Sequence, residues 1–315
     1  MRRIFFGLFL LCTPLFALAD GTISLGMTPQ YPLPGQNVTL TASNFSGSAD
    51  TASYTWTING KTALQGTGAK TLTVAAGAAG SSQEVTVEAR VNGESIGTDT
   101  VTIHPADVDL IWEGQTVTPP LYIGRPLANG GSRVTILAVP HIFVGSHEAA
   151  PDSLIYTWKI NGATSGSQSG YGKSSIVVTP PSFAQAFTVS VHVETKDGAA
   201  AEGSVVIQPQ SPKILIYENA PLLGIRFDSA VSGFMSFPAQ EISFTAYPLF
   251  VSTIAGLKYS WTLDGNTFAV DTERPRDVTF RKVGDTTSGT HTVTLSFQNP
   301  NNFLENGAAS FKLTF

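Results

Sequence analysis

Three nearly identical octapeptides occur at regular intervals along the chain. They read YTWTINGK, YTWKINGA and YSWTLDGN, and they begin at Tyr54, Tyr156 and Tyr259. Their tryptophans, Trp56, Trp158 and Trp261, lie 102 and 103 residues apart. A period near 100 residues is too long for a solenoid repeat but fits a complete β-sandwich domain. The spacing therefore predicts three tandem domains in this chain of 315 residues.

Each octapeptide has the pattern of a strand that ends in a tight turn. Because alternate side chains of a strand point to opposite faces, the Tyr and the Trp of each copy are predicted to share the core face. The predicted core pairs are Tyr54 and Trp56, Tyr156 and Trp158, and Tyr259 and Trp261. The Asn-Gly or Asp-Gly pair that follows is typical of a type I′ hairpin, which needs positive φ at both residues. We expect the tryptophans to pack on neighbours such as Leu40, Ile136 and Phe244.

Further strand patterns keep the same order in every copy. Short apolar strands are predicted upstream of the Trp at 38–42, 134–138 and 242–246, and alternating strands downstream at 85–91, 187–193 and 293–297. Short Pro-containing linkers, predicted to be stiff, lie around Pro105 and around Pro209 and Pro212. The predicted fold is all-β, with three tandem immunoglobulin-like sandwiches after a signal peptide. The predicted segments are 1–19 for the signal peptide and 20–104, 105–209 and 210–315 for the domains.

The N-terminus has the features of a secretory signal peptide. Arg2 and Arg3 precede an apolar run that ends in Ala-Leu-Ala at Ala19, a small-residue cleavage pattern. Cleavage there would remove Cys12, the only cysteine, so each mature domain would depend on its core without a disulfide. A lipid on Cys12 is disfavoured because Leu11 stands where lipoprotein signals have a small residue. We expect a secreted or extracytoplasmic protein of the cell envelope or surface.

Charge and hydropathy exclude several classes of partner. The chain has 23 acidic and 18 basic residues, a formal net charge of −5 and no basic run. This balance argues against nucleic acid and against an anionic membrane surface as partners. No apolar stretch of spanning length follows the signal peptide, so no transmembrane segment is expected in the mature chain.

The pattern Tyr-x-Trp-x-[Ile/Leu]-[Asn/Asp]-Gly, followed by an alternating valine strand, resembles the polycystic-kidney-disease (PKD) and immunoglobulin-like domains of exported bacterial proteins. The chain lacks the aromatic-Gly-Asp-Gly that usually follows the Trp of PKD domains. The segments DVDLIWEGQTVTPPLYIGRPL and ILIYENAPLLGIRF are also similar to segments of secreted bacterial proteins. The resemblance implies an extracytoplasmic and usually non-catalytic role, and no particular ligand.

Residues that could carry catalysis or bind metal do not form a recognisable motif. The five histidines, among them His141 and His147, fall in separate strands or loops, and no G-x-S-x-G or Cys nucleophile is present. Asp107 and Asp109 at the first linker could bind calcium, but the second linker lacks such a pair. We expect no catalytic residue, no metal and no cofactor. An enzyme with a cryptic cross-strand site remains the least favoured alternative.

An apolar block follows each linker and is absent from the first domain. It contains Trp112 and Tyr122 in the second domain, and Tyr217, Leu222 and Phe227 in the third. The block is either a recognition surface for a glycan, a peptide or another subunit, or an interdomain or core-covering contact. The sequence thus predicts a non-catalytic protein that acts in binding, in adhesion or as an envelope spacer. Its partner would be a protein or glycan at the cell surface, and an accessory carbohydrate-binding role is the alternative.

Overall fold

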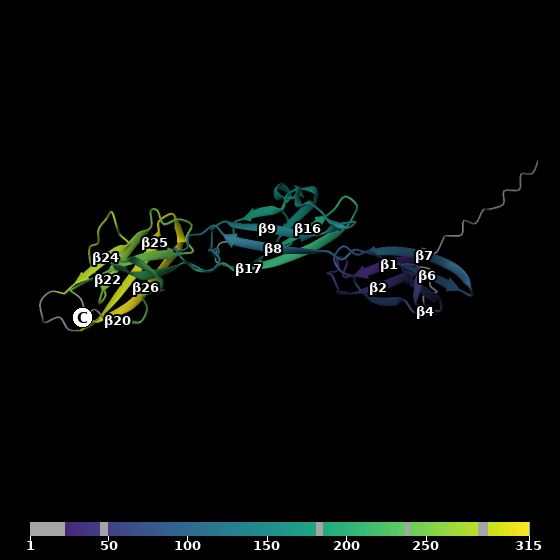
Figure 1. Ribbon diagram of the computed structural model, residues 1–315, viewed down its shortest axis with the longest axis horizontal. Helices are drawn as coiled ribbons and strands as arrows, with labels where there is room; N and C mark the ends of the chain where they lie inside the picture. Colours follow the sequence, from purple (N-terminus) through teal and green to yellow (C-terminus); the bar gives the residue numbers. More distant parts are fainter. Residues whose placement is uncertain (1–22, 45–49, 181–184, 237–239, 283–288, 315) are drawn as a thin grey trace, which may run out of the picture. The chain divides into compact units, whose positions relative to one another are not determined.

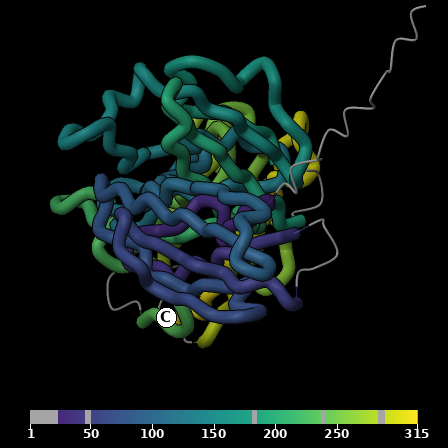
Figure 2. The backbone as a smooth tube through the Cα atoms, turned by 90° about the vertical axis from the view of Figure 1, so that its right-hand side faces the viewer, coloured from purple at the N-terminus to yellow at the C-terminus, as the bar shows by residue number. Residues whose placement is uncertain are grey.

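The computed structural model describes residues 23–44, 50–180, 185–236, 240–282 and 289–314. The chain divides into two compact units, unit 1 up to Pro105 and unit 2 from Ala106 (Figure 1). The predicted signal peptide lies outside the described residues. Strands dominate both units, and the helical elements in the described ranges are two single 3-10 turns, η1 (Pro151–Ser153) and η2 (Gly166–Gln168). Figure 2 shows the same backbone turned by 90° about the vertical axis.

Unit 1 contains one β-sandwich, called sandwich 1. Its strands are β1 (Ile23–Thr28), β2 (Asn37–Asn44), β3 (Ser53–Ile58), β4 (Lys61–Thr67), β5 (Thr71–Ala75), β6 (Gln83–Val91) and β7 (Glu94–Ile103). One sheet has the order β1-β2-β5 and the other β4-β3-β6-β7, with all pairs antiparallel. Strands one, two and five therefore face strands three, six and seven, which is the division of an immunoglobulin-like sandwich.

Unit 2 begins with sandwich 2, which has the same plan. Its strands are β8 (Asp107–Gly114), β9 (Val134–His141), β10 (Phe143–Val144), β11 (His147–Glu148), β12 (Ile155–Ile160), β13 (Ala163–Thr164), β14 (Gly170–Tyr171), β15 (Ser175–Val178), β16 (Phe187–Glu194) and β17 (Ala200–Ile207). One sheet has the order β15-β9-β8 and the other β13-β12-β16-β17, with β14 also paired to β12. The short strands β10 and β11 form a separate ribbon.

Sandwich 3 completes unit 2 and carries extra strands at its edges. Its strands are β18 (Lys213–Ala220), β19 (Gly224–Ala230), β20 (Phe234–Ser236), β21 (Glu241–Leu249), β22 (Lys258–Leu263), β23 (Asn266–Thr267), β24 (Asp277–Arg281), β25 (Thr290–Asn299) and β26 (Asn302–Thr314). The sheets have the orders β19-β18-β21-β24 and β20-β26-β25-β22-β23. β20 runs parallel to the end of β26, whereas β25 and β26 form a long antiparallel hairpin (Figure 1).

The octapeptides build the same structure in all three sandwiches. Each indole N–H donates to a backbone carbonyl further along the chain: Trp56 to Ala69 at 2.8 Å, Trp158 to Lys173 at 2.8 Å and Trp261 to Pro275 at 3.1 Å. Each Trp side chain is at most 1% exposed. A buried indole that keeps a hydrogen-bond partner avoids the penalty for an unpaired N–H.

The turn after each Trp strand also recurs. φ is positive at both central residues, for example 48° at Asn59 and 75° at Gly60, as the predicted type I′ turn requires. In each copy the side chain of the first turn residue accepts a backbone N–H from the adjacent strand: Asn59 from Glu84, Asn161 from Thr188 and Asp264 from Thr292. The bonds to Asp264 from the Thr292 N–H and the His291 side chain hold the pKa of that carboxyl below its ordinary value. The hairpin prediction is confirmed.

Each sandwich encloses its own hydrophobic core. The cores contain Leu40 with Trp56, Ile136 with Trp158, and Phe244 with Trp261. Tyr54 and Tyr156 are fully buried, whereas Tyr259 is partly buried and packs at the margin of its core. The predicted all-β fold of tandem immunoglobulin-like sandwiches is confirmed.

Candidate functional site

The aromatic ends of the two apolar blocks are buried. Trp112 on β8 is 9% exposed and belongs to the core of sandwich 2, with the Arg125 guanidinium 4.0 Å above its ring. Tyr217 on β18 is 4% exposed and meets the partly buried Phe227 of β19 edge to face, with ring centroids 5.1 Å apart. Burial raises the pKa of the Tyr217 hydroxyl. Neither Trp112 nor Tyr217 therefore presents an open ring face to a ligand.

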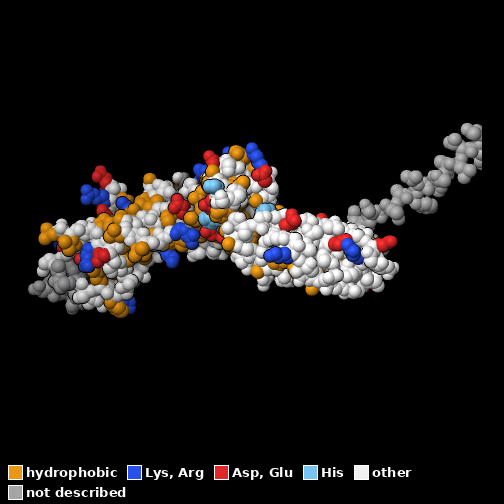
Figure 3. Space-filling view, turned by 45° about the vertical axis from the view of Figure 1, so that its right-hand side comes forward, with side chains coloured by type: hydrophobic (Ala, Val, Ile, Leu, Met, Phe, Trp, Pro, Cys, Tyr) orange, Lys and Arg blue, Asp and Glu red, His pale blue; other side chains and the backbone are white. Residues whose placement is uncertain are grey.

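The aliphatic members of the blocks lie at the surface. Leu222, in the turn between β18 and β19, is 98% exposed, and Leu223 beside it is also exposed. Tyr122, in the connection from β8 to β9, is half-exposed between the exposed Leu121 and Ile123. Figure 3 shows hydrophobic side chains over much of the visible face of unit 2. The predicted block is thus divided between core and surface.

The connection from β8 to β9 also joins sandwich 2 to sandwich 3. The Val117 N–H donates to Val251 O at 2.7 Å, and the Phe250 N–H donates back to Val117 O at 2.9 Å. The Val117 side chain packs against the core of sandwich 3. The ring of Tyr122 meets Phe250 edge to face at 6.0 Å, a geometry worth about 0.5–1.5 kcal/mol. The two sandwiches therefore share backbone pairing and apolar contact within unit 2.

A tight turn from sandwich 2, residues 129–132, reaches the same junction. Asn129 and Ser132 are almost completely buried and bond to each other through both main chain and side chain. The Asn129 amide, Nδ2, donates to Phe250 O at 2.6 Å and to Glu305 Oε1 at 2.9 Å. Both Nδ2 protons are thus used on sandwich 3. The linker between the two sandwiches lies beside this turn and is bonded to the residue just before it, because Gln210 N donates to Ala128 O at 2.7 Å.

Glu305 is the centre of this junction. Its side chain is fully buried on β26. Besides Asn129, the carboxylate accepts from Ser252 N at 2.8 Å and from Asn299 Nδ2 at 2.6 Å. Burial of a carboxylate is costly unless its oxygens accept hydrogen bonds, and bonds to a charged acceptor contribute about 1.5–3 kcal/mol each. Asn129 and Glu305 are 176 positions apart, and the sequence carried no signal that would have paired them.

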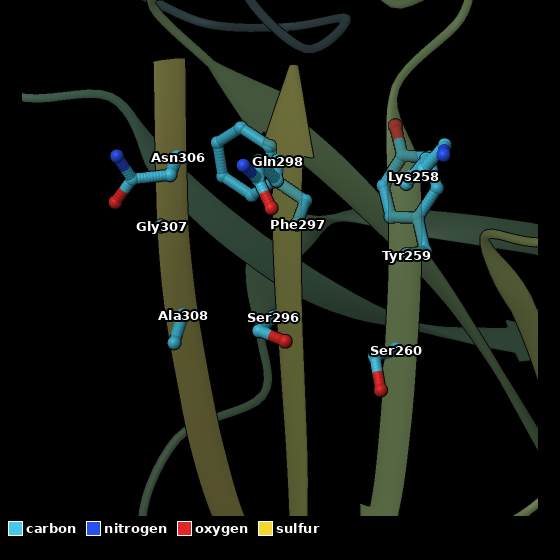
Figure 4. A pocket seen from close by; sticks show the side chains of 9 residues that line it. All are labelled: Lys258, Tyr259, Ser260, Ser296, Phe297, Gln298, Asn306, Gly307 and Ala308. Atoms are coloured by element: carbon cyan, nitrogen blue, oxygen red, sulfur yellow. The ribbon is translucent and has the colours of Figure 1, made fainter. Parts of the chain in front are cut away.

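A shallow groove of about 500 Å³ crosses the outer face of sandwich 3 over β22, β25 and β26 (Figure 4). Six exposed side chains line it in two rows that follow the strand register: Lys258, Gln298 and Asn306 in one row, and Ser260, Ser296 and Ala308 in the next. Phe297 lies between the rows and faces the core at 3% exposure. The small side chains of Ser260, Ser296 and Ala308 form the floor of the groove, and the longer polar side chains of the other row form its side. No motif in the sequence marked these residues as a site.

The strand beneath the groove carries Tyr259, whose side chain faces the core, as its register partner Phe297 does. Its hydroxyl oxygen is buried there and has no hydrogen-bond partner among the described residues. Burial raises the pKa of this phenol to about 12, although the nearby Arg276 charge acts in the opposite direction. A buried hydroxyl without a partner is rare because it forfeits its bonds to water.

Of the ionisable residues considered as catalytic or metal sites, His141 contacts two carboxylates, whereas Asp107 and His147 bond to their sequence neighbours. Nδ1 of His141 lies 2.7 Å from Glu148 Oε1, and its Nε2 lies 3.8 Å from Asp109. Asp107 accepts the Val108 N–H at 2.8 Å, while His147 bonds to Ser146. Within the described residues, no group of three or more His, Cys, Asp or Glu side chains is placed to hold a metal ion.

The described parts of the chain contain no helix that is long and apolar enough to cross a membrane.

Comparison with known proteins finds similar solved structures but no matching family model and no matching curated protein. Among solved structures, the chain is similar to the three N-terminal domains of the highly immunogenic outer capsid protein of bacteriophage RB49, with 15% identity, a TM-score of 0.27, and 93% of this chain and 98% of that chain covered.

Two further solved structures are similar over most of the chain. One is the central fibronectin-III array of RIM-binding protein, with 12% identity, a TM-score of 0.33, and coverage of 92% and 95% of this chain and that chain. The other is SGBP-B of the Bacteroides ovatus mixed-linkage glucan utilization locus, in complex with a mixed-linkage heptasaccharide. It has 11% identity, a TM-score of 0.23, and coverage of 92% and 70%.

Proposed function

We propose that the chain is a non-catalytic, exported binding or adhesion protein in which unit 2 is a rigid spacer. In this proposal the domains are PKD-like and comprise residues 20–104, 105–209 and 210–315, after a signal peptide of residues 1–19. Sandwiches 2 and 3 hold their surface loops at a fixed separation at the cell surface, where a protein or glycan binds.

The observation that carries this proposal is the bonding of Glu305. A junction that served only as a tether would need no buried carboxylate, because an exposed linker solvates its own polar groups. Here one carboxylate accepts from sandwich 2 through Asn129 and from its own sandwich through Ser252 and Asn299. Separation of the two sandwiches would remove one of these bonds and expose Val117. Such a contact opposes rotation of one sandwich against the other.

Distance measurement between spin labels tests this rigidity. The full chain with Cys12→Ser would carry Thr188→Cys on β16 and Thr292→Cys on β25, since both positions are exposed. We expect a narrow distance distribution between the two labels. Glu305→Ala should broaden it, because the buried donors lose their acceptor. Glu273→Ala, at an exposed carboxylate elsewhere on sandwich 3, should leave it unchanged. A broad distribution in the unmodified pair would refute the spacer.

A further inference from the structure

The groove over β22, β25 and β26 differs from the rest of its sheet in its free hydrogen-bonding groups. Lys258, Ser260, Ser296 and Gln298 make no side-chain hydrogen bond to any described residue. Elsewhere on the same face, the hydroxyls of Thr290 and Thr314 bond across strands at 3.1 Å. Ser260 and Ser296 are also register partners and could pair, yet they remain free. The groove therefore concentrates donors and acceptors that the protein does not use itself, apart from the Asn306 amide, which donates to Phe303 O at 2.7 Å.

The chemistry of the lining excludes most ligand classes. None of the nine lining residues is acidic, so the groove offers no carboxylate to a cation. One ammonium, from Lys258, is too little positive charge for a polyanion. The exposed side chains include no aromatic ring or large aliphatic group that could hold an apolar ligand. The groove crosses the face of the sheet, so it is not an edge to which a peptide strand could add.

The remaining class is a neutral chain with many hydroxyl groups. Amide, hydroxyl and ammonium groups can bond to sugar hydroxyls as donors and, except for the ammonium, also as acceptors. Three adjacent strands span about 10 Å, so an extended chain could meet both rows along its length.

We propose that this groove, formed by Lys258, Ser260, Ser296, Gln298 and Asn306, binds a neutral oligosaccharide. The inference rests on the proposed binding function and assigns it a site and a ligand class. The site is distinct from the apolar blocks, because the ligand meets polar side chains on an open sheet face rather than Trp112 or Tyr217.

Titration of the full chain with defined sugars tests the site. The probes are neutral hexasaccharides of β-1,4-linked glucose, β-1,3-linked glucose and β-1,4-linked N-acetylglucosamine, with heparin as a polyanionic control. Amide chemical shifts and calorimetry report binding. We expect at least one neutral probe to bind and to shift the amides of Ser260, Ser296 and Ala308. Heparin should not compete with it.

Matched variants then locate the site. Gln298→Ala combined with Asn306→Ala should weaken binding at least tenfold. Thr292→Ala, which is exposed on β25 outside the groove, should not change affinity. Lys258→Gln should weaken binding by a smaller factor, because one amide replaces one ammonium donor. Thermal unfolding of each variant confirms that its fold is retained, as expected for exposed positions.

The proposal would be overturned if none of the neutral probes bound, or if heparin bound in their place. It would also be overturned if the groove variants bound as tightly as Thr292→Ala does. A dimer in sedimentation that the groove variants dissociate would show that the groove is a contact between two copies of the chain instead. None of these outcomes affects the label distances that test the spacer. Failure of the groove and failure of the spacer can therefore be told apart.

Discussion

Sandwich 1 and sandwich 2 share one repeat but use the connection after their first strand differently. Both bury a Trp whose indole N–H is bonded at 2.8 Å, and both have the same Asn-Gly turn. In sandwich 1 the connection from β1 to β2 is short. In sandwich 2 the connection from β8 to β9 is longer and supplies Val117, Tyr122 and Asn129 to the junction with sandwich 3. The repeat thus builds each sandwich, and the connection builds the junction.

The two units also differ in how many large hydrophobic side chains they expose. In the described part of unit 1, the exposed large hydrophobic residues are Leu33 and Leu64. Unit 2 exposes many more large hydrophobic residues. They include Leu121 and Ile123 in the connection after β8, and Leu222 in the turn after β18. Figure 3 shows the contrast on one face of the molecule. Exposed apolar residues in clusters mark interaction surfaces more often than isolated ones do. Contacts with partners are therefore expected to concentrate on unit 2.

The largest expected effect comes from removal of a core tryptophan. Trp158→Ala should destabilise sandwich 2 by about 3–5 kcal/mol, since it leaves a large cavity and orphans the Lys173 carbonyl. Trp56→Ala should have a similar effect on unit 1. Hydrogen exchange should show that Trp56→Ala loosens unit 1 alone, whereas Trp158→Ala also weakens protection around Phe250 in sandwich 3. A Trp158→Ala chain that melts within a degree or two of the unmodified chain would contradict the core assignment.

A smaller effect is expected at the junction turn. Asn129→Ala removes donors to Phe250 O and Glu305 and the acceptor of Ser132 N. Each buried group left unpaired costs about 1–3 kcal/mol, so the loss should be about 2–3 kcal/mol after relaxation. Denaturant unfolding of unit 2 measures it. Asn301→Ala, an exposed residue of the β25–β26 turn, is the control and should cost under about 0.5 kcal/mol. Equal losses of unfolding free energy in Asn129→Ala and Asn301→Ala would show that the 129–132 turn does not stabilise the junction.

Alkaline pH should weaken unit 2 through its buried tyrosines. Burial raises the pKa of Tyr156 and of Tyr259 to about 12 from 10.0. Because the folded-state pKa lies above the unfolded one, their stabilisation is complete below about pH 10 and is lost as pH rises toward 12. The loss should be on the order of 2 kcal/mol for the fully buried Tyr156 and less for Tyr259. Tyrosinate absorbance followed with unfolding should show this slope, reduced in Tyr156→Phe. Stability that stays level from pH 10 to 12 would contradict it.

Processing of the N-terminus should have the smallest structural effect. We predict that the exported protein begins at Asp20 and contains no titratable thiol when denatured, because Cys12 is removed with the signal peptide. Unit 1 begins its first described strand only at Ile23, so its stability should not change. Intact mass and N-terminal sequencing provide the check. Retention of Met1, or a lipid on Cys12, would show that the export assignment is wrong.

The fold could be predicted from local sequence because its main signals are local. Alternation of apolar residues and the Asn-Gly turn predict the Trp hairpin within eight residues, and the order of strands follows from three copies. Register is less accessible. Each Trp pairs with a strand residue at a different sequence separation: Trp56 with Val87, Trp158 with Val191 and Trp261 with Leu295. The separation differs because the segments between the two strands differ in length.

The candidate sites could be predicted only in part. The apolar blocks were visible as composition, yet strand alternation decides that Trp112 faces the core while its neighbour Ile111 is exposed. Asn129 and Glu305 each look like an ordinary turn or strand residue, and only their placement 176 positions apart makes a junction. The groove was invisible because Ser260, Gln298 and Asn306 are typical solvent-facing residues of any strand until the register aligns them.

Residual dipolar couplings of the backbone amides test most directly the claim that sandwiches 2 and 3 form one rigid body. They would be measured on the full chain in weak alignment, with sandwich 1 fitted separately as an internal reference. We expect one alignment tensor to fit the couplings of sandwiches 2 and 3 together as well as two separate tensors do, and we expect Glu305→Ala to abolish this agreement. Distinct tensors for the two sandwiches in the unmodified chain would contradict it.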